Sequence, residues 1–68
     1  MKICDFTKPE IDYLLTECNF TEDERVVFIA LSHGNSIENT SEICNISVST
    51  TKRIKSRIWA KIERIENL

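Results

Sequence analysis

The amino-acid sequence predicts an all-α domain of four helices, and three observations lead to this prediction. The 68 residues include one glycine and one proline, too few turn-forming residues for a set of β-hairpins. Ten isoleucines recur among many Glu, Lys and Arg residues, mostly with the spacing of a helix. Two Thr-x-x-Glu sequences have the form of a capping box, which marks a helix start. The expected helices span about residues 8–18, 22–33, 37–44 and 48–66.

Length and composition place residues 1–68 in one small domain. No stretch approaches the roughly 18 uninterrupted apolar residues of a transmembrane helix, and the amino terminus lacks a secretory signal, so we expect a cytoplasmic protein. Cys4, Cys18 and Cys44 form an odd set without a C-x-x-C motif, and His33 is the only histidine. We therefore expect reduced thiols in or near the core, with no metal site and no cofactor. Without paired carboxylates, a nucleophile–base set or a phosphate loop, the sequence argues against an enzyme.

The first helix is expected to begin at a capping box formed by Thr7 and Glu10, with Pro9 in its first turn. Phe6, directly before the box, is placed to pack on Ile11 as a hydrophobic staple. The helix then carries one apolar stripe, made of Ile11, Leu14, Leu15 and Cys18.

The second helix is expected to begin at a capping box formed by Thr21 and Glu24. Residues 26–31 are all apolar, a stripe too wide for a surface helix, so this helix should be the most buried element of the domain. Gly34 suits the left-handed position that ends a helix. His33, in the last turn, is expected to interact with the free carbonyls there, because the sequence offers it no catalytic partner.

The third and fourth helices are separated by a tight turn at residues 45–47. Ser36 is expected to cap the third helix, and Ser47 the fourth. The fourth helix has about twenty residues and a length of roughly 30 Å. Its inward stripe consists of Thr51, Ile54, Ile58, Ile62 and Ile65.

The charges are divided unevenly along the chain. Residues 1–42 contain three basic and nine acidic residues, a formal charge of −6, whereas residues 43–68 contain six basic and two acidic residues, a formal charge of +4. The net charge of −2 therefore hides a basic carboxyl-terminal part, which indicates that one end of the domain meets a polyanion.

Two helices joined by a tight turn, the second with a basic outer face, are the helix-turn-helix arrangement, whose second helix enters the major groove of DNA. At about 100° per residue, Ser49, Lys52, Arg53 and Ser56 lie opposite the isoleucine stripe of the fourth helix. Hydrogen-bond donors are thus expected on the side where DNA would lie.

Two segments of the sequence carry a resemblance to a known family. Residues 36–54, SIENTSEICNISVSTTKRI, resemble the helix-turn-helix of sigma-factor region four, which reads the upstream promoter element. Residues 20–28, FTEDERVVF, are similar to the opening of that domain, with its T-x-x-E-R-x-V-F run. The resemblance extends over residues 20–62 and is shared by small phage and bacterial regulators that consist of this module alone.

Four residues depart from the family pattern. Thr40 and Thr51 stand where the family usually has Ile and Val, and Ser41 and Cys44 stand where Ala and Leu are usual. A buried Thr hydroxyl needs a hydrogen-bond partner, which in a helix can be the carbonyl one turn earlier. We therefore expect a helix-turn-helix core that is looser than usual.

The resemblance implies a set of DNA contacts. Base edges would be read by Val48, Ser49, Lys52 and Arg53, with Arg53 bidentate to a guanine. Phosphate contacts would come from Ser36, Ser47, Thr50 and Arg57. The function implied is sequence-specific binding of double-stranded DNA by a transcriptional regulator. The alternative is a protein-interaction adaptor whose acidic amino-terminal half contacts RNA polymerase or another regulator, with weak DNA affinity.

Two interpretations stay open for the apolar residues near the carboxyl terminus. Trp59 widens the apolar face of the fourth helix and would either pack against the first helix or, with Ile62 and Ile65, form a homodimer contact. A homodimer is a plausible partner arrangement because small helix-turn-helix proteins usually bind two half-sites.

Overall fold

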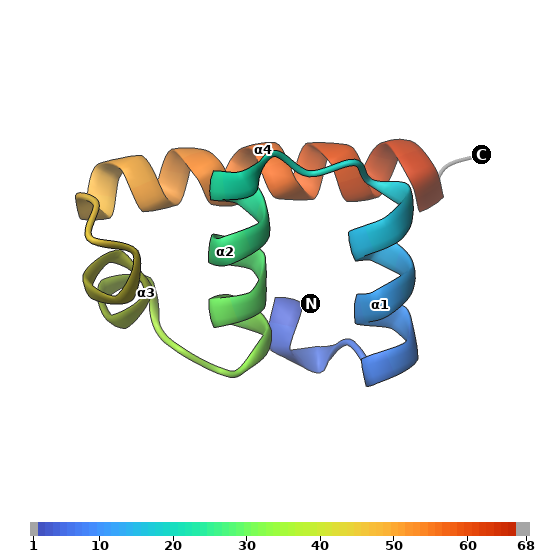
Figure 1. Ribbon diagram of the computed structural model, residues 1–68, viewed down its shortest axis with the longest axis horizontal. Helices are drawn as coiled ribbons and strands as arrows, with labels where there is room; N and C mark the ends of the chain where they lie inside the picture. The colour runs from blue at the N-terminus through green and yellow to red at the C-terminus, as the bar shows by residue number, and fades with distance from the viewer. Residues whose placement is uncertain (1, 67–68) are drawn as a thin grey trace.

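The computed structural model describes residues 2–66, with side chains for residues 2–65, and over these residues the protein is all-helical without a strand. Four α-helices follow a short 3-10 turn, and each predicted helix is confirmed, with its two ends within one residue of expectation. The elements are η1 (Ile3–Asp5), α1 (Lys8–Glu17), α2 (Glu22–Ser32), α3 (Ile37–Cys44) and α4 (Val48–Glu66) (Figure 1).

Both predicted capping boxes are present. The backbone N–H of Glu10 donates to Thr7 Oγ1 at 3.4 Å, and the backbone N–H of Thr7 donates to Glu10 Oε1 at 2.8 Å. The same reciprocal pair joins Thr21 and Glu24, at 3.3 and 3.0 Å. The starts of α1 and α2 are therefore fixed by local hydrogen bonds.

Residues with positive φ follow three of the helices. Asn19 (φ 52°) follows α1, Gly34 (φ 89°) follows α2, and Asn45 (φ 57°) caps α3. Glycine and asparagine adopt this left-handed conformation at the least cost, and it turns the chain out of the helix. At the end of α2, the backbone N–H of His33 bonds to two helix carbonyls while its ring is exposed, so the interaction expected there is made by the backbone.

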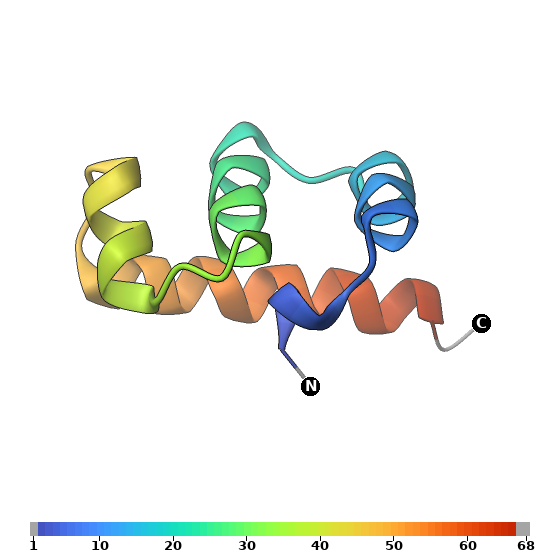
Figure 2. The ribbon, with the colours of Figure 1, turned by 90° about the horizontal axis from the view of Figure 1, so that it is seen from below.

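Helices α1, α2 and α3 stand on the same side of α4, which runs along the whole molecule (Figures 1 and 2). The longest dimension of the protein is 33 Å, and α4 by itself accounts for about 28 Å of it. Although α4 is long, it is amphipathic, and none of the helices in the described part of the chain is apolar enough to cross a membrane.

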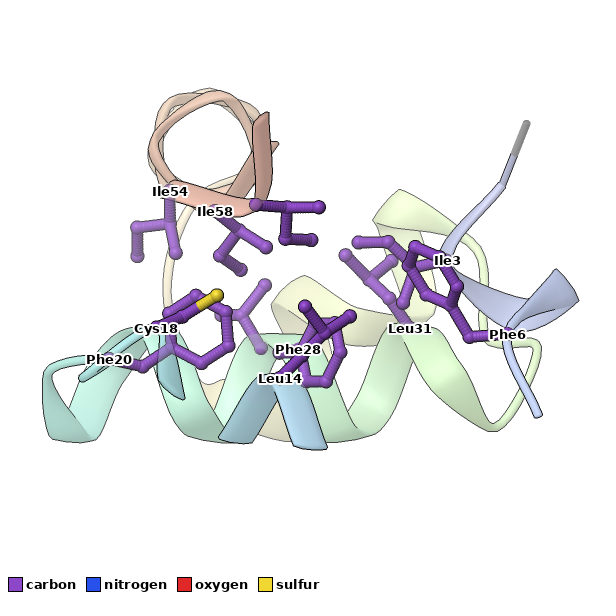
Figure 3. Close-up of a cluster of buried hydrophobic side chains, with 11 residues drawn as sticks. Ile3, Phe6, Leu14, Cys18, Phe20, Phe28, Leu31, Ile54 and Ile58 are labelled. Atoms are coloured by element: carbon purple, nitrogen blue, oxygen red, sulfur yellow. The ribbon is translucent and has the colours of Figure 1, made fainter. Parts of the chain in front are cut away.

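The hydrophobic core lies between α4 and the helices that stand on it (Figure 3), and α3 and its turn contribute to it through the partly buried Ile37, Cys44 and Ile46. Phe28, Ile58 and Ile62 are completely buried. The rings of Phe20 and Phe28 are tilted against each other with 5.1 Å between their centroids. The buried apolar cluster consists of Ile3, Phe6, Leu14, Cys18, Phe20, Val27, Phe28, Leu31, Ile54, Ile58 and Ile62.

Helix α2 is less uniformly buried than its apolar run predicts. Val27 and Phe28 are buried, but Val26 is 44% exposed and Ile29 is 37% exposed. Five of the eleven residues of α2 are nevertheless buried, a larger share than in the other described elements, so the prediction that α2 is the most buried element is confirmed. The apolar run is, however, not enclosed on every side. The reason is geometric, since α2 packs against α4, α3 and η1, and these elements leave one side of α2 uncovered.

The cysteines also depart in part from expectation. Cys18 is buried in the core and Cys44 is half-buried, as predicted, but Cys4 on η1 is exposed. Burial, assisted by the negative charge of Asp23, raises the pKa of the Cys44 thiol. The Cys44 thiol is therefore a poor nucleophile at neutral pH.

Candidate nucleic-acid interface

The turn between α3 and α4 is held by its own hydrogen bonds. The backbone N–H of Ile46 donates to the carbonyl of Ser41 at 2.9 Å, directly after the left-handed Asn45. Ser47 Oγ accepts the backbone N–H of Thr50 at 3.1 Å, so Ser47 caps α4 as predicted. The leading end of α4 is thus fixed relative to α3, which is the arrangement that a helix-turn-helix needs to present one face of its second helix.

The outer face of the first three turns of α4 is polar and cationic. Lys52, Arg53 and Arg57 are exposed, and none of them forms an ion pair with another described residue. Val48 is 37% exposed and Thr50 is half-buried at the edge of this face. The structure brings the candidate contacts of α4 onto one solvent-facing surface, which we call the outer face: Val48, Ser49, Thr50, Lys52, Arg53, Ser56 and Arg57.

The hydroxyl groups predicted to contact phosphates differ in whether their proton is free to form a further hydrogen bond. Ser36 Oγ accepts the backbone N–H of Asn39 at 3.1 Å and caps α3, so its own proton remains available. Ser47 Oγ and Thr50 Oγ1 lie 2.8 Å apart in a mutual hydrogen bond. One of their two protons is used between them, and the pair therefore retains one for a phosphate oxygen.

The two threonines of the helix-turn-helix core are both 0% exposed but differ in their hydrogen bonds. Thr51 Oγ1 donates to the carbonyl of Ser47 at 2.9 Å, one turn earlier, as the sequence predicts. Thr40 Oγ1 is buried without a partner. The unpaired hydroxyl of Thr40 destabilises the fold at this position, whereas the prediction of a looser helix-turn-helix core stays a prediction.

A buried ion pair joins the start of α2 to the second half of α4. The carboxylate of Glu24, 4% exposed, accepts a hydrogen bond from Lys61 Nζ, which also lies 6.0 Å from the ring centroid of Phe20. Burial acts to raise the pKa of Glu24, but the hydrogen bonds from Lys61 and Thr21, with the Lys61 charge, hold that pKa below its ordinary value of 4.5. Glu24 therefore has a second role, beyond the capping box, that was not predicted from the sequence. The available sign was its spacing of three and four residues from Val27 and Phe28, which puts Glu24 on the inward side.

The residues predicted to form a dimer contact are mostly engaged within the chain. Ile62 is 0% exposed and belongs to the core, so its predicted place in a dimer interface is wrong. Trp59 is half-buried and packs against Phe6, with 6.0 Å between ring centroids. Ile65 is half-buried against the core. The packing interpretation of Trp59 is therefore confirmed, although its partner precedes α1 rather than belonging to it.

A second surface that the sequence did not indicate lies between α2 and α3. Val26 and Ile29 of α2 and Ile43 of α3 are 44%, 37% and 59% exposed, and they line one hollow. A neighbouring hollow shares Val26 and continues to Glu22 and Asp23 at the start of α2. Neither hollow is lined by a lysine or an arginine. We call this surface the α2–α3 groove.

Comparison of the chain with protein-family models, curated proteins and solved structures found no match. The resemblance to sigma-factor region four therefore stays a prediction, and the functional argument depends on the geometry of the helix-turn-helix itself.

Proposed function

We propose that the protein binds double-stranded DNA sequence-specifically through its helix-turn-helix and regulates transcription as a small module similar to sigma-factor region four. The observation that carries this proposal is the outer face of α4, where Lys52 and Arg53 are exposed at the leading end of the helix without an internal ion-pair partner. Cations held on a rigid helix and left unpaired are available to a polyanion. Such a protein acts where the DNA is, which for a bacterial or phage regulator is the cytoplasm.

The dimensions of α4 agree with insertion into DNA. A helix with its side chains is about 10–12 Å across, and the major groove of B-DNA is about 12 Å wide. In that position, the guanidinium of Arg53 donates two parallel hydrogen bonds to O6 and N7 of a guanine. Lys52, Ser49 and Val48 contact neighbouring base edges, and Ser56 lies one turn further along the outer face.

The acidic net charge does not oppose this docking, because the charges are segregated. No acidic residue lies between Val48 and Arg57, whereas residues 8–24 carry most of the acidic side chains. The interaction with DNA phosphates depends on the cations at the contact surface and, beyond roughly 10 Å at 0.1 M salt, remote charges are screened.

Selection of bound duplexes from a random-sequence pool, at two salt concentrations, tests the proposal. We expect one sequence motif to be enriched, with an affinity that falls steeply as salt rises. Recovery of unselected sequences at both salt concentrations would contradict sequence-specific binding.

A homodimer on two half-sites is the corresponding proposal for the assembly on DNA. With Ile62 inside the core, the residues of the predicted dimer contact that a second copy could still reach are the half-buried Trp59 and Ile65. Sedimentation at micromolar concentration, with and without the selected duplex, distinguishes a monomer from a homodimer. A monomer under both conditions would contradict this assembly.

The α2–α3 groove favours a second candidate function, that of an adaptor. Three apolar side chains next to Glu22 and Asp23 suit an amphipathic helix with apolar anchors and a basic end, presented by RNA polymerase or another regulator. Ile43→Asp places a charge in the groove, and Arg53→Ala removes a cation from the outer face. If Ile43→Asp abolishes regulation in cells while Arg53→Ala leaves it intact, the adaptor function is supported over DNA recognition.

A further inference from the structure

The 3-10 turn η1 and the loop that joins α2 to α3 both lie beside α4 (Figure 2). Residues of these three segments line a groove of about 340 Å³. The 3-10 turn η1 lies beside the loop that joins α2 to α3, and Lys55 of α4 completes the wall. We call this the Lys2–Lys55 groove. It is lined by Lys2, Ile3, Cys4, Leu31, Gly34, Asn35, Ser36, Ile37 and Lys55.

The chemistry of the Lys2–Lys55 groove is that of an anion site. Its charged residues are Lys2 and Lys55, and no carboxylate lines it. Neither lysine forms an ion pair with another described residue. The nearest acid in sequence, Asp5, accepts the backbone N–H of Lys2 at 3.0 Å and does not line the groove. Ser36 adds a hydroxyl that accepts the backbone N–H of Asn39 and donates to no other described residue.

The position of the groove relative to the outer face of α4 is specific. Lys55 and Arg57 are two positions apart, a rotation of about 200° around the helix, so they lie on nearly opposite sides of α4. Lys55 therefore lies beyond one edge of the outer face, next to the inward stripe, whereas Arg57 and Thr50 lie at the opposite edge. A helix inserted in the major groove has one DNA strand along each edge, so the two edges meet different phosphate backbones.

We propose that the Lys2–Lys55 groove binds phosphodiester groups of one DNA strand, with Lys2 and Lys55 as the cationic contacts and Ser36 as a hydroxyl donor. This inference rests on the proposed function and extends it to two residues that the sequence analysis did not assign. Lys2 escaped notice because more than fifty residues separate it from Lys55 in the chain, and Lys55 because it lies near the inward stripe of α4.

Variants of the two lysines test the groove through the salt dependence of binding. We expect Lys2→Gln and Lys55→Gln each to reduce the slope of log affinity against log salt by about 0.9, the change for one lost phosphate contact. A duplex of mixed sequence is a sufficient probe, because phosphate contacts do not depend on base sequence. The matched control is Lys8→Gln, since Lys8 is an exposed lysine of α1 outside the groove and should leave the slope unchanged.

Cys4 provides a second measurement on the unaltered protein, because its exposed thiol lines the same groove. Bound duplex is expected to cover the thiol of Cys4 and so to slow its alkylation. Mass spectrometry measures the rate of alkylation with and without the duplex. If both lysine variants keep the salt slope of the unaltered protein, or if Cys4 reacts at its full rate when the protein is saturated with duplex, phosphate binding in the Lys2–Lys55 groove is contradicted. The proposed function would then be unaffected. A reduced slope without enrichment of any sequence would support the groove and contradict specific recognition. A protein that binds no duplex would overturn both.

Discussion

The two halves of α4 carry the same isoleucine period but use their polar side chains differently. In the second half, Ile58 and Ile62 are completely buried, and Lys61 is committed to the ion pair with Glu24. In the first half, Lys52 and Arg53 face solvent, and no described residue pairs with them. The comparison teaches that the inward stripe makes α4 a structural rod along its whole length, whereas its leading half gathers three exposed cations without an ion pair among the described residues, Lys52, Arg53 and Arg57.

The largest expected effect is a loss of stability in the second half of α4, which we call the structural half. Ile58→Ala removes a fully buried side chain and should lower the free energy of unfolding by about 2–5 kcal/mol. A core of this size supplies only about 3–5 kcal/mol, so this variant should keep little or none of its stability at room temperature. Urea denaturation followed by circular dichroism measures the loss. Val48→Ala, in the exposed leading half, serves as the control and should change stability by less than about 1 kcal/mol; equal losses in both variants would break the comparison.

The ion pair of the structural half makes stability depend on pH. Because folding holds the pKa of Glu24 below its ordinary value of 4.5, the stabilisation is fully present above that value and is lost as pH falls through the folded pKa. Glu24→Gln removes the charge and should cost about 1–3 kcal/mol at neutral pH. Denaturation between pH 7 and pH 3 should therefore show the stabilities of the two proteins converging in acid. A difference that stays constant across this range would show that the charge of Glu24 does not stabilise the fold.

One substitution in the helix-turn-helix core, which supports the leading half of α4, is expected to increase the stability of the fold. Thr40→Val replaces an unpaired buried hydroxyl with a methyl group and should raise the free energy of unfolding by about 1 kcal/mol. Thr51→Val is the matched control, since Thr51 gives up its hydrogen bond to Ser47 and should gain less. Thermal unfolding of both variants measures the difference. A Thr51 variant that is the more stable of the two would contradict the hydrogen-bond assignments.

The smallest expected effect concerns the edge of the outer face. Arg57→Ala should reduce the slope of log affinity against log salt by about one without altering the preferred DNA sequence, because Arg57 is assigned to a phosphate. Titration of the selected duplex and of one scrambled duplex, at several salt concentrations, separates the two quantities. A changed sequence preference would contradict the phosphate assignment and would indicate that Arg57 contacts a base.

The helices were predictable because their starts and stops depend on neighbours in sequence. The boxes at Thr7 and Thr21, the serine cap at Ser36 and the left-handed Gly34 all act within four residues. The exposure of Arg53 followed from the period of the isoleucines in the same helix. These features need no knowledge of tertiary packing.

The remaining features could not be derived from local pattern, because they depend on which elements meet. The pairing of Glu24 with Lys61 spans 37 residues of sequence. The exposure of Val26 reflects how few neighbours a chain of 68 residues can place around α2. The juxtaposition of Lys2 and Lys55 depends on where the amino-terminal segment returns to α4.

The most direct test of the division of α4 compares two arginines on the same helix. Arg53 and Arg64 are both exposed, but Arg53 lies in the leading half and Arg64 close to the carboxyl end. For the duplex obtained by selection, Arg53→Ala should weaken binding by about 1–3 kcal/mol and relax the preference at one base pair, whereas Arg64→Ala should bind as the unaltered protein does. Equal affinities of the two variants for that duplex would contradict the assignment of DNA recognition to the leading half of α4.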